Sequence, residues 1–297
     1  MRVADTSNMF RFRIAVFLVT ASIMAIDLQA SRHRAAAGPP YIPQPKHVIV
    51  VILENEDVAA RDQPFLGELA REGALLTNYH GLTHPSQPNY VALFAGSAYG
   101  ITDDNPVTID VRNLADLLEA NGATWKVYAE DYPGDCFLGS SAAGGLYVRR
   151  HVPFIEFTDI QQEASRCANI VNATQLNADI AAGALPSFAL YVPNNQHNGH
   201  DTSLAVADQW LEQTFEPLLG DERFITDTLL VVTFDESNSP SNNTVSALFY
   251  GAMVQHGSQS DHYYDHYSLL RTIEAIIGTG SLGKHDARAD EIIGIWR

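Results

Sequence analysis

Apolar residues along the chain form short runs that alternate with segments of helical spacing. Residues 47–53 (HVIVVIL) and 228–234 (TLLVVTF) are nearly continuous apolar runs rich in β-branched residues. Such runs are typical of strands that are buried on both faces of a sheet. Shorter apolar runs predict further strands at 74–79, 125–129, 187–192 and 247–254.

Helical spacing of apolar residues is clearest in residues 204–216, where Trp210 and Phe215 fall on one side and Pro217 is expected to help end the helix. Further helices are expected at 65–71, 89–94, 111–120, 176–182 and 266–277. Residues 131–170 are rich in glycine and are predicted to form a loop region, either an insertion or a flap over a site. The alternation of apolar strands with helices predicts an α/β three-layer sandwich around a largely parallel central sheet.

Length and composition fit a protein with a sizeable core. The chain has 297 residues, of which 46% are hydrophobic, and this suits one large domain. Its formal net charge of -17 repels nucleic acid and anionic membranes at long range. We therefore expect neither as a partner.

The N-terminal segment has the order of an export signal. Arg2, Arg11 and Arg13 precede an apolar run at 14–26, and small residues follow it. We expect residues 1–37 to be a signal peptide and leader, and 38–297 to be one catalytic domain. An uncleaved anchor is the alternative, although the run is short for a membrane span. The prediction is a secreted or periplasmic protein that keeps no stable membrane anchor after cleavage.

The chain contains two cysteines, Cys136 and Cys167. An exported protein meets oxidising conditions, which favours a disulfide between them. The alternative is two unpaired cysteines that serve as small hydrophobic residues.

Polar side chains follow the two most apolar strands. Glu54 and Asn55 come directly after residues 47–53, and Asp235 and Glu236 after 228–234. Ligand sites in such sheets lie outside the carboxyl ends of the strands. Carboxylates that converge there repel one another unless a cation lies between them. We expect a divalent cation, with Mg, Ca, Mn, Zn and Fe all open; the alternative is that polar residues merely begin two loops.

Ser86 lies in the segment 83–90 (THPSQPNY), at the expected start of a helix. A serine there is commonly an N-cap. A helix N-terminus also binds phosphate through free N–H groups and the positive end of its dipole. A serine hydroxyl needs a base or a metal to become a good nucleophile. Since no carboxylate–histidine pair is evident beside it in the sequence, a metal is the expected activator.

Several histidines are candidate phosphate-binding groups. His197, His200 and Asp201 lie in the loop after residues 187–192, where metal or phosphate contact is expected. A surface position is the alternative for each of these histidines. His266 opens the predicted helix 266–277, so capping or packing is its alternative.

Several segments, in this order, resemble the phosphoesterase family of secreted acid phosphatases and phospholipases C, which has the alkaline-phosphatase-like fold. The matching segments are Glu54-Asn55, 84–90 (HPSQPNY), 147–154 (YVRRHVPF), 234–236 (FDE) and 266–272 (HYSLLRT). The resemblance covers roughly residues 46–297 and is closest to secreted acid phosphatases of mycobacteria. The family loop usually reads Asn-Asp-x-His-Asp, and Asn198 replaces its acid here.

The resemblance implies roles residue by residue. It implies one divalent cation held by Glu54, Asn55, Ser86, Asp235 and Glu236. It implies Ser86 as the nucleophile, with His200 and His84 as further catalytic candidates. It implies phosphate contacts from His151, His197, His200, Asp201 and His266.

The expected activity is hydrolysis of phosphate monoesters through a phosphoserine, on a small phosphorylated substrate or a phospholipid head group, including phosphoinositides. Two alternatives stay open. One is a phospholipase C or other phosphodiesterase on the same scaffold. The other is a secreted cation-binding protein without catalysis.

Overall fold

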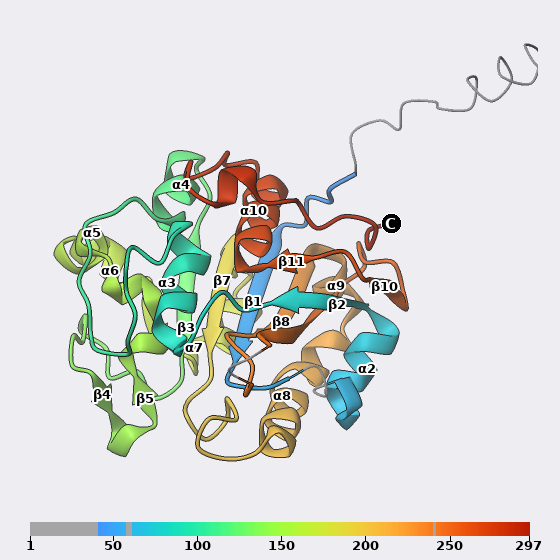
Figure 1. The fold of residues 1–297 in the computed structure, drawn as a ribbon, viewed down its shortest axis with the longest axis horizontal. Coiled ribbons are helices and arrows are strands. Elements are labelled where there is room, and N and C mark those ends of the chain that lie inside the picture. The colour runs from blue at the N-terminus through green and yellow to red at the C-terminus, as the bar shows by residue number, and fades with distance from the viewer. Residues whose placement is uncertain (1–40, 58–60, 240–241) are drawn as a thin grey trace, which may run out of the picture. The chain divides into compact units, whose positions relative to one another are not determined.

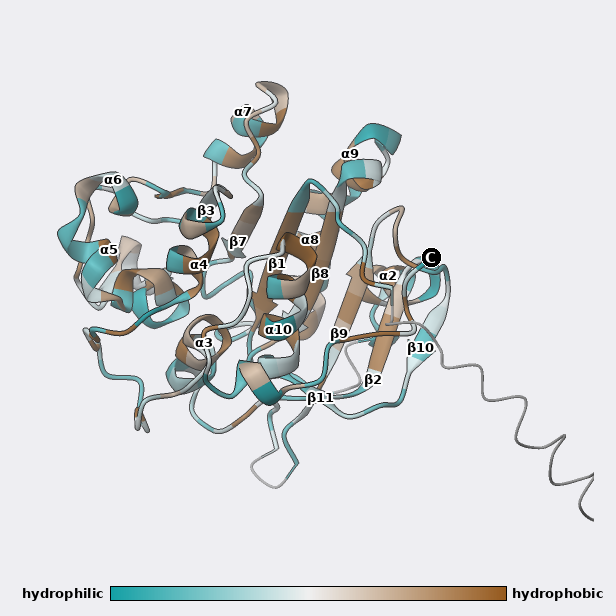
Figure 2. Cartoon of the chain, turned by 90° about the horizontal axis from the view of Figure 1, so that it is seen from above, coloured by the Kyte–Doolittle hydropathy of each residue, from teal (hydrophilic) through white to brown (hydrophobic). Residues whose placement is uncertain are grey.

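Two apolar strands form the centre of the sheet. In the computed structural model, which describes residues 41–57, 61–239 and 242–297, β1 (His47–Leu53) pairs in parallel with β8 (Thr228–Phe234). Both strands are almost fully buried, and Figure 2 shows them as the most hydrophobic part of the chain. Their register places Leu53 opposite Phe234. The residues that follow the two strands therefore leave the sheet side by side.

The remaining strands extend the sheet in both directions, and helices surround it (Figure 1). The order is β10-β2-β9-β8-β1-β7-β3-β6, with β11 beside β2. Only the pairs of β9 with β2 and with β8 are antiparallel among the described strands of this sheet. The bounds are β2 (Ala74–His80), β3 (Trp125–Ala129), β6 (Ile170–Asn172), β7 (Phe188–Val192), β9 (Thr244–Tyr250), β10 (Ser258–Ser260) and β11 (Tyr264–Asp265). The predicted α/β fold with a largely parallel sheet is confirmed.

The helices pack in pairs around the sheet. α3 (Ser86–Ala95) contacts α10 (His266–Ile277), and α2 (Pro64–Glu72) contacts α8 (Leu204–Leu219). The Asp208 carboxylate of α8 accepts the backbone N–H groups of Phe65 and Leu66, which otherwise lack partners at the start of α2. The other α-helices are α4 (Leu114–Ala120), α5 (Thr158–Gln162), α6 (Ala164–Cys167), α7 (Gln175–Ala181) and α9 (Glu222–Asp227).

Several element boundaries differ from the sequence prediction; α4, for example, begins at Leu114 rather than at residue 111. α8 continues past Pro217 to Leu219, because Leu218 and Leu219 pack against the core. β9 lies three residues earlier than expected and ends before Gly251. α3 begins at Ser86 rather than at Asn89, because side chains from elsewhere satisfy its first turn.

The loop region predicted at residues 131–170 contains short elements, including the hairpin of β4 (Ser141–Ala142) and β5 (Tyr147–Val148). A disulfide joins Cys136 to Cys167, with their Cα atoms 5.7 Å apart. The predicted disulfide is therefore confirmed. It joins the beginning of this region to α6, near its end.

The predicted signal peptide and the question of a membrane-spanning helix concern different parts of the chain. The predicted signal peptide at 1–37 lies outside the described residues. Within the described ranges, no helix combines the length and apolarity that a bilayer crossing requires.

Candidate active site

Ser86 is the first residue of α3, and a network around Asn89 fixes the turn that leads to it. The Asn89 side-chain oxygen accepts the N–H groups of Leu82 and Thr83 at 2.8 and 3.1 Å. Its nitrogen donates to the carbonyls of Thr83 and Pro85 at 2.8 and 3.1 Å. Asn89 thus fixes the turn that precedes Ser86. The side chain of Ser86 is buried.

The Ser86 hydroxyl points at Glu54. Its Oγ donates to Glu54 Oε2 at 3.0 Å. Tyr90, one helical turn after Ser86, donates its hydroxyl to the other oxygen, Oε1. Glu54 follows β1 directly and has no exposed surface. Ser86 and Glu54, two residues predicted to share this site, are therefore in contact, and Tyr90 joins them.

Asp235 lies beside this pair, at the end of β8. Its Oδ1 accepts the backbone N–H of Asn55 at 3.1 Å. Its Oδ2 is buried and lacks a hydrogen-bond partner among the described residues. Burial raises the pKa of Asp235 to about 6. Burial, and then the charge of Asp235, raise the pKa of Glu54 well above its ordinary value. Burial therefore destabilises the charge of both groups, and Asp235 adds to that effect on Glu54.

These oxygens fit a hard cation chemically, but they form no closed cage. Within the described ranges, no group of three or more His, Cys, Asp or Glu side chains is arranged to hold a metal. The set here is the Glu54 and Asp235 carboxylates with the Ser86 hydroxyl. Mg²⁺ commonly takes one or two protein carboxylates and completes its shell with water and substrate phosphate. The unpartnered Asp235 oxygen is what such an ion would satisfy.

Glu236 turns toward His84. Its Oε2 lies 2.8 Å from His84 Nδ1. Burial raises the pKa of Glu236 to about 8, with further contributions from Asp235 and Asp104. The other ring nitrogen of His84 is buried and has no partner in the described part of the chain. Glu236 thus orients an imidazole two residues before Ser86, while its predicted role as a metal ligand stays a prediction.

The loop after β7 covers Glu54 from another direction. Glu54 N–H donates to the Asn198 carbonyl at 2.9 Å. The Asn198 side-chain nitrogen lies 3.4 Å from His151 Nδ1, and His151 Nε2 lies 3.2 Å from Glu54 Oε1. With the amide donating to Nδ1, we assign the ring proton to Nε2, facing Glu54. Burial lowers the pKa of His151 well below its ordinary value, so the ring is neutral. Asn198, where the family carries an acid, therefore sets a tautomer here.

His200 also lies near this centre. Its ring centroid is 6.3 Å from that of His151, and its Nδ1 is 2.7 Å from Asp201 Oδ1. The side chain is partly exposed. Asp201 therefore holds one ring nitrogen of His200 and leaves the other for a substrate.

The structure gives His197 and His266, both predicted phosphate contacts, partners within the protein. His197 stacks on Trp210 and bonds Glu130 at 2.6 Å, because Glu130 is a half-buried acceptor that gathers donors. His266 is buried with both ring nitrogens engaged, Nε2 on the Asp235 carbonyl at 2.6 Å and Nδ1 on the Tyr79 hydroxyl at 2.9 Å. His197 therefore braces the loop after β7, and His266 positions the backbone of Asp235. Both ring nitrogens of His266 are therefore occupied, whereas His197 keeps Nε2 without a partner in the described part of the chain, and its phosphate contact stays a prediction.

The helix N-terminus is also less open than expected. Asp104 Oδ1 accepts the Gln87 N–H at 3.0 Å, and Pro88 has no N–H. Of the first three residues of α3, only Ser86 retains an N–H without a partner in the described part of the chain. Phosphate binding cannot rest on the helix end alone.

Sequence reasoning missed three residues of this centre: Tyr90, Asp104 and Arg150. Arg150 lies 3.6 Å from Asp104, and its positive charge lowers the pKa of Glu54. Tyr90 and Arg150 lie within segments already singled out, next to recognised positions. The sequence did not show which neighbouring side chains point inward.

Comparison with known proteins agrees with this fold. Residues 56–279 match the phosphoesterase family. The chain belongs to this family. It is 36% identical to a probable acid phosphatase of Kluyveromyces lactis, over 82% of this chain and 61% of that protein. It is 32% identical to a phosphatidylinositol-3-phosphatase of Mycobacterium tuberculosis, over 98% of this chain and 95% of that protein.

The chain spans about three fifths of two fungal relatives, 61% of the Kluyveromyces lactis protein and 60% of a phosphate-repressible acid phosphatase from Penicillium chrysogenum. Solved structures confirm the fold. An alkaline phosphatase superfamily protein from Vibrio parahaemolyticus matches with a TM-score of 0.58 and 15% identity, over 83% of this chain and 71% of that one. Lipoteichoic acid synthase LtaP from Listeria monocytogenes matches with a TM-score of 0.59 and 10% identity, over 86% and 79%.

Proposed function

We propose that this phosphoesterase hydrolyses phosphate monoesters, with Ser86 as the nucleophile. The observation that carries the proposal is the buried hydrogen bond from Ser86 Oγ to the Glu54 carboxyl group. A base in hydrogen-bond contact is what a serine hydroxyl needs to become reactive.

The residues account for both steps of the reaction. Ser86 Oγ attacks phosphorus, and its proton passes to Glu54 Oε2, to which it is already hydrogen-bonded. The bond from phosphorus to the leaving oxygen breaks, and His200, held by Asp201, gives that oxygen a proton. Water then attacks the phosphoserine while the now neutral His200 takes its proton. Glu54 returns its proton to Ser86 as phosphate leaves. His84, held by Glu236, is the second candidate acid.

A divalent cation belongs to the proposal. Glu54, Asn55 and Asp235 would hold it, and it would offset charge on the phosphoryl oxygens and acidify the Ser86 hydroxyl. Within the protein, Asp235 keeps one oxygen available for it, and His266 fixes the backbone of that residue.

The proposed setting is outside the cytoplasm. The Cys136–Cys167 disulfide supports an oxidising compartment. The relative from Mycobacterium tuberculosis, named for phosphatidylinositol 3-phosphate chemistry, matches nearly the whole chain. We therefore include phosphoinositide head groups with simple phosphate monoesters as substrate candidates.

The test is to replace Ser86 by alanine and measure hydrolysis of p-nitrophenyl phosphate, with the exposed Ser165→Ala as the matched control. We expect Ser86→Ala to lose at least about a thousandfold in kcat, while the control keeps wild-type activity. Acid quenching of wild-type turnover should reveal one phosphoryl group on the peptide that contains Ser86. Activity of Ser86→Ala within a few-fold of wild type would sink the proposal.

A further inference from the structure

Adjacent arginines before His151 have opposite surroundings. Arg149 is buried, and its guanidinium donates to the Leu138 and Val107 carbonyls and to Glu156 Oε2 at 2.8 Å. Its charge is therefore neutralised within the protein. Arg150 has one ion-pair partner in the described part of the chain, Asp104 at 3.6 Å. That distance is too long for a good hydrogen bond.

The Arg150 side chain is underused for a partly buried cation. Its Nε is buried without a hydrogen-bond partner among the described residues, and its side chain is 22% exposed. A guanidinium carries five N–H donors in a planar fork that matches phosphate oxygens. Buried polar groups normally have partners, so this fork has capacity for a ligand.

Asp104 connects Arg150 to the helix that carries the nucleophile. One carboxylate oxygen of Asp104 accepts the Gln87 N–H at 3.0 Å, and the other faces Arg150. Gln87 directly follows Ser86. Burial raises the pKa values of Glu54 and Tyr90 well above their ordinary values, and the charge of Arg150 opposes that rise in both. The carboxylate of Asp104 thus lies between Arg150 and the start of α3.

The charge of the centre creates a need for such a cation. A phosphate monoester that approaches Ser86 meets the carboxyl groups of Glu54, Asp235, Glu236 and Asp104. A metal held by the first two offsets part of that repulsion. The remaining phosphoryl oxygens need donors elsewhere, because the first turn of α3 offers so few.

We propose that Arg150 binds the phosphoryl oxygens of the substrate and exchanges its loose contact with Asp104 for them. This rests on the proposed function, since it assigns a further substrate-binding residue to the same centre. It also sets a preference. A monoester dianion offers more charge and one more terminal oxygen to Arg150 than a diester monoanion does. Arg150 therefore favours monoesters over diesters.

The kinetic test compares Arg150→Ala and Arg150→Lys with Arg223→Ala, an exposed arginine that carries the same change of charge. For p-nitrophenyl phosphate at fixed ionic strength, we expect Arg150→Ala to lower kcat/KM by about tenfold to a hundredfold. Arg150→Lys should recover part of the loss, since it keeps the charge but not the fork. The loss on bis(p-nitrophenyl) phosphate should be smaller. Arg150→Ala kinetics equal to those of Arg223→Ala would overturn the proposal.

A second readout needs no turnover. Inorganic phosphate should raise the thermal unfolding midpoint of the wild type and of Arg223→Ala in the presence of Mg²⁺, and it should do so much less for Arg150→Ala. Asp104→Asn keeps the acceptor for Gln87 but removes the competing charge, so phosphate should bind it a few-fold more tightly. An equal phosphate shift in Arg150→Ala and wild type would contradict the role of Arg150. If the wild-type protein hydrolysed neither substrate but was still stabilised by inorganic phosphate, that result would instead contradict the proposed function.

Discussion

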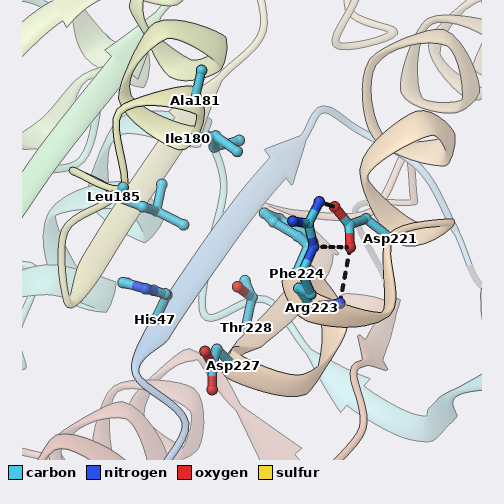
Figure 3. Close-up of a pocket in the computed structure, with 10 residues that line it drawn as sticks. His47, Ile180, Ala181, Leu185, Asp221, Arg223, Phe224, Asp227 and Thr228 are labelled. Carbon is cyan, nitrogen blue, oxygen red and sulfur yellow. Dashed lines mark hydrogen bonds and ion pairs between the residues drawn. The ribbon is translucent and has the colours of Figure 1, made fainter.

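The two ends of strands β1 and β8 hold acidic groups in opposite circumstances. At the carboxyl ends, Glu54 and Asp235 are buried side by side, and burial raises the pKa of each. At the amino ends lies a pocket of about 450 Å³, lined among others by His47, Phe224 and Asp227 (Figure 3).

The polar groups of that pocket have partners or solvent. Asp221 forms an ion pair with Arg223 at 2.8 Å, which lowers the pKa of Asp221. His47 Nδ1 bonds the Pro186 carbonyl at 2.9 Å, and Asp227 pairs with Lys46 at 2.7 Å. A cavity alone therefore indicates little chemistry. Buried carboxyl groups beside a candidate nucleophile indicate much more, because the fold tolerates their cost.

Among the variants that test the contrast between the two strand ends, Glu54→Gln is expected to have the largest effect. It removes one of the buried carboxyl groups. Glutamine is close to glutamate in shape but cannot accept the Ser86 proton. We expect a loss of at least about a hundredfold in kcat on p-nitrophenyl phosphate. The free energy of unfolding in chelator at pH 7 should rise, because a destabilised buried charge disappears. The exposed Glu222→Gln, at the other end of β8, should change neither quantity. Unchanged activity in Glu54→Gln would remove the distinction between the two ends.

A smaller effect is expected at Glu274, a buried carboxyl group with a raised pKa that lies outside the candidate active site. Glu274 on α10 is buried beside Asp286, and burial and then that carboxylate raise its pKa from the ordinary 4.5 to about 8. The Leu282 N–H and Arg271 oppose the shift without cancelling it. Between about pH 4.5 and 8 the unfolded chain has released this proton and the folded protein keeps it. Stability from Glu274 is therefore full below the lower value and falls as the pH rises.

Glu274→Gln should remove that slope, worth up to about 1 kcal/mol per pH unit, and leave kcat unchanged. Denaturant unfolding of both proteins between pH 5 and about 8 measures it, with the exposed Glu216→Gln as the control. A parallel pH dependence in Glu274→Gln and wild type would show that the buried pair does not hold the proton.

The sequence predicted the sheet better than the site. The apolar runs at residues 47–53 and 228–234 locate β1 and β8 to the residue, because continuous burial constrains every position. Position after a strand also predicted that Glu54 and Asp235 would converge, since parallel strands end at one edge, whereas the family resemblance added Ser86 to them.

Residue type alone could not assign the histidines. His151 and His200 lie at the centre, but His197 pairs with Glu130 and His266 braces Asp235. Their partners come from β2 and from the residues that directly follow β1, β3 and β8, which are far apart in the chain. Arg149 and Arg150 are adjacent and chemically identical, and only tertiary contacts separate the structural one from the available one.

The smallest expected effect belongs to the amino-end pocket. Asp227→Asn removes the ion pair with Lys46. The side chain of Asp227 is 39% exposed and that of Lys46 is 69% exposed. Water already solvates both groups, so the pair contributes little beyond what solvent provides. We expect the free energy of unfolding to fall by less than about 0.5 kcal/mol, with kcat and KM unchanged, as measured by urea unfolding and p-nitrophenyl phosphate hydrolysis. The residual difference should shrink in high salt, because salt screens exposed charges. A clear loss of activity in this variant would mean that the amino-end pocket is coupled to Ser86, and the contrast between the two ends would then have to be abandoned.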